Sequence, residues 1–91
     1  MFEQLKQQFL ASFEAKIENL KNALENQDAQ ALTVSVHQLA GSSGSYGYDA
    51  ISELCSVIET LVHDNDSIDS TTQEKTHLLI SLMAGQVNDA A

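Results

Sequence analysis

Residues 37–47 of this 91-residue chain read HQLAGSSGSYG. Before and within this stretch, small and apolar side chains recur every three or four residues, at Leu32, Val36, Leu39 and Ser43. This spacing predicts a helix with one buried stripe. With about 100° between successive residues of a helix, His37 lies roughly 130° from the centre of that stripe. We therefore expect its imidazole to face solvent or to lie at the rim of the core.

Small residues surround this histidine on the same side of the predicted helix: Thr33, Ala40, Gly41 and Gly44. A glycine inside a helix costs about 1 kcal/mol relative to alanine, so glycines beside an exposed imidazole need an explanation. We interpret them as clearance that lets another macromolecule approach the ring. The alternatives are that the glycines allow close packing against a neighbouring helix and that His37 is a rim residue with no role.

The spacing His-x-Leu-x-Gly-Ser-Ser-x-x-x-Gly resembles the phosphoacceptor motif of histidine-containing phosphotransfer (HPt) domains, on His37, Leu39, Gly41, Ser42, Ser43 and Gly47. The resemblance implies that His37 accepts a phosphoryl group from the aspartate of a response-regulator receiver domain and passes it to another receiver in a multistep two-component pathway. It implies a hybrid sensor kinase as a further partner. It also implies Mg²⁺ in the receiver's acidic pocket and no cofactor in the chain itself.

The same resemblance implies a role for Glu59, 22 positions after His37 on the next predicted helix. In the family a polar residue there often orients the imidazole, and a carboxylate would accept its N–H and leave the other nitrogen free as nucleophile. One position departs from the family. Many members carry lysine three residues after the histidine, where this chain has Ala40, and no Lys or Arg lies between Lys21 and Lys75. We expect the partner, backbone N–H groups or the hydroxyls of Ser42 and Ser43 to offset phosphoryl charge.

Apolar positions at helical spacing also precede the stretch. They predict a first helix over about residues 2–26, from Phe2, Leu5, Phe9, Phe13, Ile17, Leu20 and Leu24. Asp28 is expected to cap a second helix over about residues 29–45. That helix is expected to end at Tyr46-Gly47-Tyr48, with Gly47 in a left-handed conformation and the tyrosines covering one end of the fold.

Two further helices are predicted after the stretch. Asp49 is expected to cap the third, which extends to about His63 and has an apolar face of Ala50, Ile51, Leu54, Val57, Ile58, Leu61 and Val62. The last runs from residue 69 or 70 to Gln86, with Leu78, Leu79, Leu82, Met83 and Val87 apolar and residues 88–91 a frayed tail. Short polar breaks between amphipathic helices predict one all-α domain over residues 1–91, an antiparallel four-helix bundle with up-down-up-down topology.

Composition limits the classes of partner. Thirteen acidic residues against four basic ones give a net charge of −9, which repels nucleic acid and anionic membranes. The single cysteine, Cys55, cannot form an internal disulfide and is expected to be buried, and no apolar run approaches the roughly 20 residues that span a bilayer. No signal peptide is visible, and the chain begins with methionine. We expect a free-standing, monomeric cytoplasmic module.

The chain has a histidine nucleophile but no Walker-type or Gly-rich nucleotide loop. We therefore expect it neither to bind ATP nor to phosphorylate itself, so that the partner brings the catalysis. Two alternatives remain. One is a non-catalytic helical bundle that binds and sequesters a receiver or kinase with His37 unused, which Ala40 supports. The other is a metal-binding protein that uses His37, His63 and His77, although these show no metal-ligand spacing.

Overall fold

The computed structural model describes the backbone of residues 2–90 and the side chains of residues 3–87. Five helices follow one another along the chain: α1 (Phe2–Ala11), α2 (Phe13–Glu25), α3 (Ala29–Ser45), α4 (Asp49–Asn65) and α5 (Ser70–Ala90). Over these residues there is no strand, which confirms the predicted all-α fold. None of these helices has both the length and the apolar character needed to cross a membrane.

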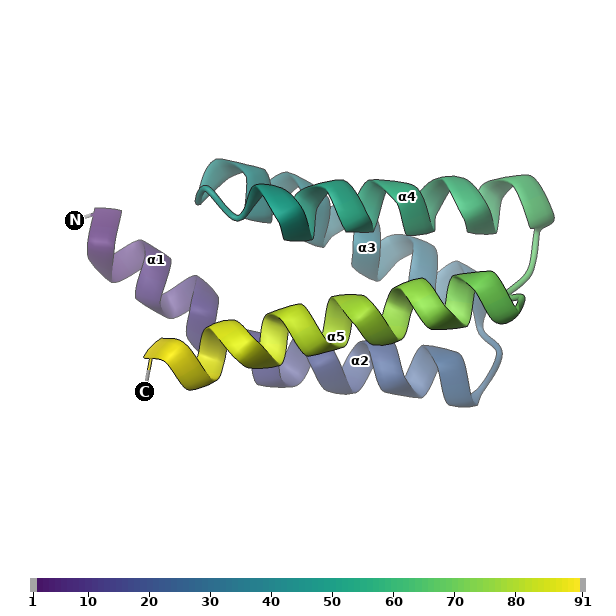
Figure 1. Ribbon diagram of the computed structural model, residues 1–91, viewed down its shortest axis with the longest axis horizontal. Coiled ribbons are helices and arrows are strands. Elements are labelled where there is room, and N and C mark those ends of the chain that lie inside the picture. The colour runs from purple at the N-terminus through teal and green to yellow at the C-terminus, as the bar shows by residue number, and fades with distance from the viewer. Residues whose placement is uncertain (1, 91) are drawn as a thin grey trace.

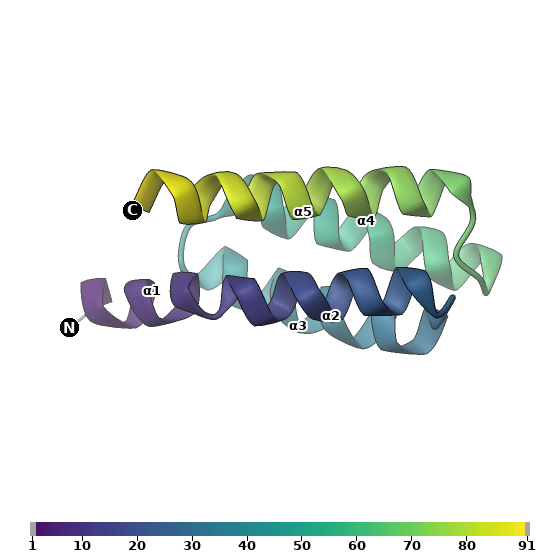
Figure 2. The same cartoon turned by 90° about the horizontal axis from the view of Figure 1, so that it is seen from below.

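Helices α2 to α5 form an antiparallel bundle (Figures 1 and 2). α3 packs between α2 and α4, and α5 closes the bundle by packing against α2 and α4. Successive helices run in opposite directions, as short connections require. The predicted up-down-up-down four-helix bundle is therefore confirmed, and α1 is an additional element at its end.

The prediction of one unbroken helix over residues 2–26 is wrong at Ser12, which separates α1 from α2. The Ser12 hydroxyl donates to the carbonyl of Phe9, and the Ser12 N–H is shared between the carbonyls of Gln8 and Phe9. A serine hydroxyl that bonds to the preceding turn bends a helix. In Figure 1, α1 accordingly inclines away from the line of α2, toward the turn between α3 and α4.

The bend brings α1 over the tyrosines of that turn. The Phe9 ring stacks on Tyr46 with centroids 4.8 Å apart and lies 6.0 Å from the ring of Tyr48. Tyr48 also lies 5.9 Å from Phe13. The tyrosines therefore cover the end of the bundle as predicted, and the aromatic cluster joins α1 and α2 to the turn after α3. The side chain of Phe2, predicted for the apolar face, lies outside those described.

The buried stripe of α3 determines which way His37 points. Leu32 and Val36 are fully buried, Leu39 is 2% exposed and Ser43 is fully buried. Burying an aliphatic side chain of this kind contributes about 1.5–3 kcal/mol. Rotating α3 about its axis would expose several such side chains and lose this stabilisation for each of them. This stripe meets the other helices in one core, whose members include Phe13, Leu20, Ile51, Ile58, Leu79 and Met83. Leu5, Val57, Leu78 and Leu82, predicted on apolar faces, stay exposed.

The turns agree with the sequence except at one cap. Asp28 caps α3, since its Oδ1 accepts the N–H of Ala31 at 3.1 Å, and Gly47 has a φ of +85°. The expectation that Asp49 caps α4 is wrong. The N-cap is Tyr48, which makes no side-chain bond there, and Asp49 begins the first turn, where a carboxylate interacts favourably with the helix dipole.

Two helices end later than expected. α4 extends to Asn65, beyond His63, and stops where Asp66 takes a left-handed φ of +51°. α5 continues to Ala90, beyond the predicted end at Gln86. The frayed tail expected at residues 88–91 includes side chains and a last residue outside those described, and it stays a prediction.

Candidate functional site

His37 projects from α3 beside α4. Its side chain is 73% exposed, and its Nδ1 lies 3.0 Å from Oε2 of Glu59, whose own side chain is 34% exposed. On α3, His37 directly follows the buried Val36. On α4, Glu59 lies one turn after the buried Cys55. The structure therefore brings together the two residues that the sequence analysis proposed as nucleophile and orienting group.

This contact selects one form of the imidazole. A carboxylate only accepts hydrogen bonds, so in the neutral ring Nδ1 carries the hydrogen and donates it to Glu59. Nε2 is then left with a free lone pair on an exposed side chain. A fixed tautomer with an available lone pair is what a histidine nucleophile requires.

Gly41, one turn after His37, has no packing reason to be glycine within the part of the chain that is described. A Cβ added there would meet nothing within 4 Å. At Gly44 an added Cβ would lie 3.4 Å from the Ser52 hydroxyl, which is ordinary contact. Close helix packing is therefore no explanation for Gly41 and only a partial one for Gly44. Both positions are exposed, and they leave the surface beside the imidazole low.

Thr33 and Ala40 lie deeper, on the side of α3 that faces α4. Both are half-buried, and the Thr33 hydroxyl donates to the carbonyl of Ala29 at 2.9 Å. The carbonyl of Ala40 accepts the hydroxyl of Ser52, also at 2.9 Å. That bond joins α3 to α4 close to the site. These two residues border the surface around His37 and do not project from it.

The two serines after Gly41 differ sharply. Ser42 is half-buried at the surface, whereas Ser43 is fully buried and its hydroxyl has no hydrogen-bond partner among the described residues. The expectation that the Ser43 hydroxyl offsets phosphoryl charge is therefore wrong, because it cannot reach the surface. Its small side chain instead occupies the last turn of the buried stripe.

An open hollow lies beside His37, and a lysine from another helix borders it. Its lining residues are Lys16 of α2 and His37, Gln38, Gly41, Ser42 and Ser45 of α3. No lysine or arginine lies close to His37 along the chain, and the presence of Lys16 at this hollow was not predicted. The available signal was its position one turn before Leu20, since residues four apart share a helix face and Lys16 therefore flanks the buried stripe of α2.

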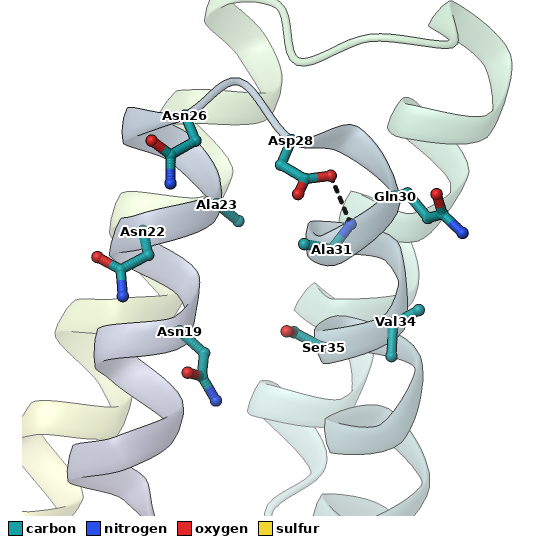
Figure 3. A pocket seen from close by; sticks show the side chains of 9 residues that line it. All are labelled: Asn19, Asn22, Ala23, Asn26, Asp28, Gln30, Ala31, Val34 and Ser35. Carbon is teal, nitrogen blue, oxygen red and sulfur yellow. Dashed lines mark hydrogen bonds between the residues drawn. The ribbon is translucent and has the colours of Figure 1, made fainter.

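A second hollow lies between α2 and α3 nearer their connecting turn (Figure 3). Amide side chains dominate its lining, with Asn19 and Asn22 from α2, Asn26 directly after it, and Gln30 from α3. Its one acid, Asp28, is already engaged with the N–H of Ala31. The lining contains no lysine, arginine, histidine or cysteine, so this hollow offers no cation and no histidine that could accept a phosphoryl group.

Cys55 is the other residue whose chemistry bears on the site. Burial, together with the nearby Glu59 carboxylate, raises the pKa of its thiol to about 12. The nucleophilic form of cysteine is the thiolate, so this thiol is inert at neutral pH. As predicted, it is a small buried side chain. Over the described residues, no three side chains of His, Cys, Asp or Glu gather as metal ligands would.

Comparison with known proteins identifies the family. The family model for the Hpt domain matches residues 4–90, nearly the whole chain. No curated protein and no solved structure gave a match. Members of the Hpt family take part in histidine phosphotransfer in two-component phosphorelays, where they interact with receiver domains and kinases. The motif around His37, the helical bundle and the family match agree, and the chain belongs to the Hpt domain family.

Proposed function

We propose that His37 is the phosphorylated residue and that the chain carries the phosphoryl group between the aspartates of two receiver domains. The observation that supports this most directly is the exposed imidazole whose Nδ1 lies 3.0 Å from Glu59. It combines access for a partner with a fixed tautomer. No other histidine combines these features, since His63 and His77 make no hydrogen bond or ion pair within the described residues.

The transfer step follows from this geometry. The Nε2 lone pair attacks the phosphorus of the partner's aspartyl phosphate, the P–N bond forms, and the bond from phosphorus to the aspartate oxygen breaks, which returns the carboxylate. The ring keeps its Nδ1 hydrogen and becomes positively charged, and the Glu59 carboxylate offsets that charge. Transfer of this kind depends on in-line positioning and charge stabilisation. The receiver's Mg²⁺ supplies Lewis-acid stabilisation of the phosphoryl oxygens.

The surface around His37 suits a docked receiver. Gly41 and Gly44 keep it low, with Thr33 and Ala40 at its edge toward α4. We propose that receiver domains dock here, that a hybrid sensor kinase supplies the pathway, and that the chain acts as a cytoplasmic monomer. Direction of net transfer then depends on which phosphorylated receiver is in excess.

The experiment uses a receiver domain charged with acetyl phosphate and Mg²⁺, mixed with the chain. We expect loss of aspartyl phosphate and appearance of an acid-labile label on the wild type. His37→Gln should fold normally and accept none, whereas His77→Gln, on exposed α5 surface, should behave as wild type. Binding of the receiver without drainage of its aspartyl phosphate would instead support the alternative of a sequestering bundle, which Ala40 in place of lysine favours.

A further inference from the structure

We propose that Lys16 of α2 is the counter-charge for the phosphoryl group on His37. This inference rests on the proposed function, because it assigns a partner to the product of that reaction. The observation behind it is that Lys16 and His37 border the same open hollow although they lie on different helices. Lys16 therefore acts on the phosphorylated imidazole through its charge and takes no part in making or breaking bonds.

The distribution of cations singles out Lys16. The chain has four basic residues, all lysines. Lys6 lies over the ring of Tyr48, 5.3 Å from its centroid, and Lys21 lies 3.9 Å from Glu18. Lys75 is on α5, which does not pack against α3. Within the described residues Lys16 is thus the one lysine that borders the hollow, and it makes no ion pair there.

The charge that phosphorylation adds favours a cation beside His37. A phosphoryl group on a side chain carries about −1.5 to −2 charges. Here it arrives on a chain with a net charge of −9 and beside the Glu59 carboxylate. The hollow's other lining groups are uncharged amide, hydroxyl and glycine positions, and the Ser45 hydroxyl already donates to the carbonyl of Gly41. Lys16 is therefore the group at this surface that can offset the added charge.

The placement of Lys16 also allows the ammonium to reach the site. Lys16 is half-buried. It also borders a third, smaller hollow between α2 and α3, which is distinct from the one in Figure 3 and is lined in part by Leu20 and Leu39. Lysine commonly lays its methylene stem along apolar surface while its ammonium stays in water. Lys16 thus lines both the groove between the two helices and the hollow that His37 borders, and a stem lying in that groove brings the ammonium toward the hollow.

The test measures the equilibrium constant for phosphoryl exchange between the chain and one receiver domain, approached from both directions. This constant compares free phosphorylated species, so it is insensitive to how well the two proteins dock. Lys16→Gln keeps most of the stem and removes the charge. We expect it to shift the equilibrium about threefold toward the phosphorylated receiver, the scale of one exposed ion pair. Lys16→Arg should stay near wild type, Lys16→Glu should shift it further, and added salt should shrink all these differences.

Lys21→Gln is the matched control, since it makes the same charge change on the same helix away from the hollow. Equal constants for Lys16→Gln and wild type, or equal shifts for Lys16→Gln and Lys21→Gln, would overturn the role of Lys16. A slower approach to an unchanged equilibrium would overturn it too, because that result assigns Lys16 to docking. Absence of label on wild-type His37 would refute the proposed function itself. If every variant becomes labelled, the proposed function stands, and the equilibrium constants alone decide the role of Lys16.

Discussion

Replacing Gly41 should change stability and phosphotransfer in opposite directions. Gly41 lies inside α3, and a Cβ there would meet nothing within 4 Å. Alanine therefore gains helix propensity without a steric cost, which stabilises the fold by about 0.5–1 kcal/mol. For a domain of this size, that gain raises the unfolding midpoint by roughly 4–8 °C per kcal/mol. If the same open space serves docking, added atoms should slow transfer from a receiver.

A graded series separates the two effects. Gly41→Ala adds one carbon and Gly41→Gln adds a longer side chain of good helix propensity, so both should unfold at higher temperature than the wild type. Transfer should fall modestly for alanine and at least tenfold for glutamine. Gly85→Ala is the matched control, because Gly85 is also helical with nothing within 4 Å and lies on α5, which does not pack against α3. It should stabilise equally and leave transfer unchanged.

Thermal unfolding by circular dichroism measures the first effect, and rapid-mixing transfer from a phosphorylated receiver measures the second. A lower midpoint for Gly41→Ala would show that the glycine is needed for packing. Full-speed transfer by Gly41→Gln would show that no partner approaches this surface closely. Either result refutes the reasoning that glycine at this position serves a visiting protein and not the fold.

Three further predictions concern single side chains. Glu59→Ala should slow transfer to His37 about tenfold, the scale of one lost charge-assisted hydrogen bond, and Glu59→Gln should slow it less because its amide oxygen still accepts from Nδ1; equal rates in a rapid-mixing assay would exclude an orienting role. Asp28→Ala should lower the free energy of unfolding by about 1 kcal/mol in urea titrations, since Asp28 caps α3, and an unchanged midpoint would show that the cap contributes nothing. The N–H and hydroxyl of Thr72 both donate to Asp69 at 2.8 Å and lower the pKa of its carboxyl group. The ionised Asp69 carboxylate therefore stabilises the fold fully above the ordinary carboxyl pKa near 3.9, and this effect fades as pH falls through the lower pKa of the folded state. The stability difference between wild type and Asp69→Asn should therefore shrink in urea titrations from about pH 6 toward pH 2, and a difference independent of pH would contradict this assignment.

Local pattern predicted what depends on a single helix. The stripe of Leu32, Val36 and Leu39 fixes the rotation of α3, and the exposure of His37 follows from it. The cap at Asp28 and the left-handed Gly47 also follow from residue type at a helix end. These features needed no knowledge of how the helices pack.

Features that depend on contacts between helices were harder to predict. The break at Ser12 accompanies the packing of Phe9 on Tyr46, a contact between residues far apart in the sequence. Glu59 was expected beside His37 only through the family resemblance, because spacing alone does not give the register of α4 against α3. Lys16 was missed for the same reason, since it lies 21 residues before His37 and reaches the hollow from α2.

The ring atom that receives the phosphoryl group is the central feature of the proposed mechanism. NMR of the chain phosphorylated by a receiver domain measures it directly through coupling between ³¹P and ¹⁵N. Because Nδ1 of His37 is held by Glu59, we predict that phosphorus couples to Nε2 of His37 and that Nδ1 keeps its hydrogen. Phosphorus on Nδ1, on His63 or His77, or on no histidine at all would contradict the account.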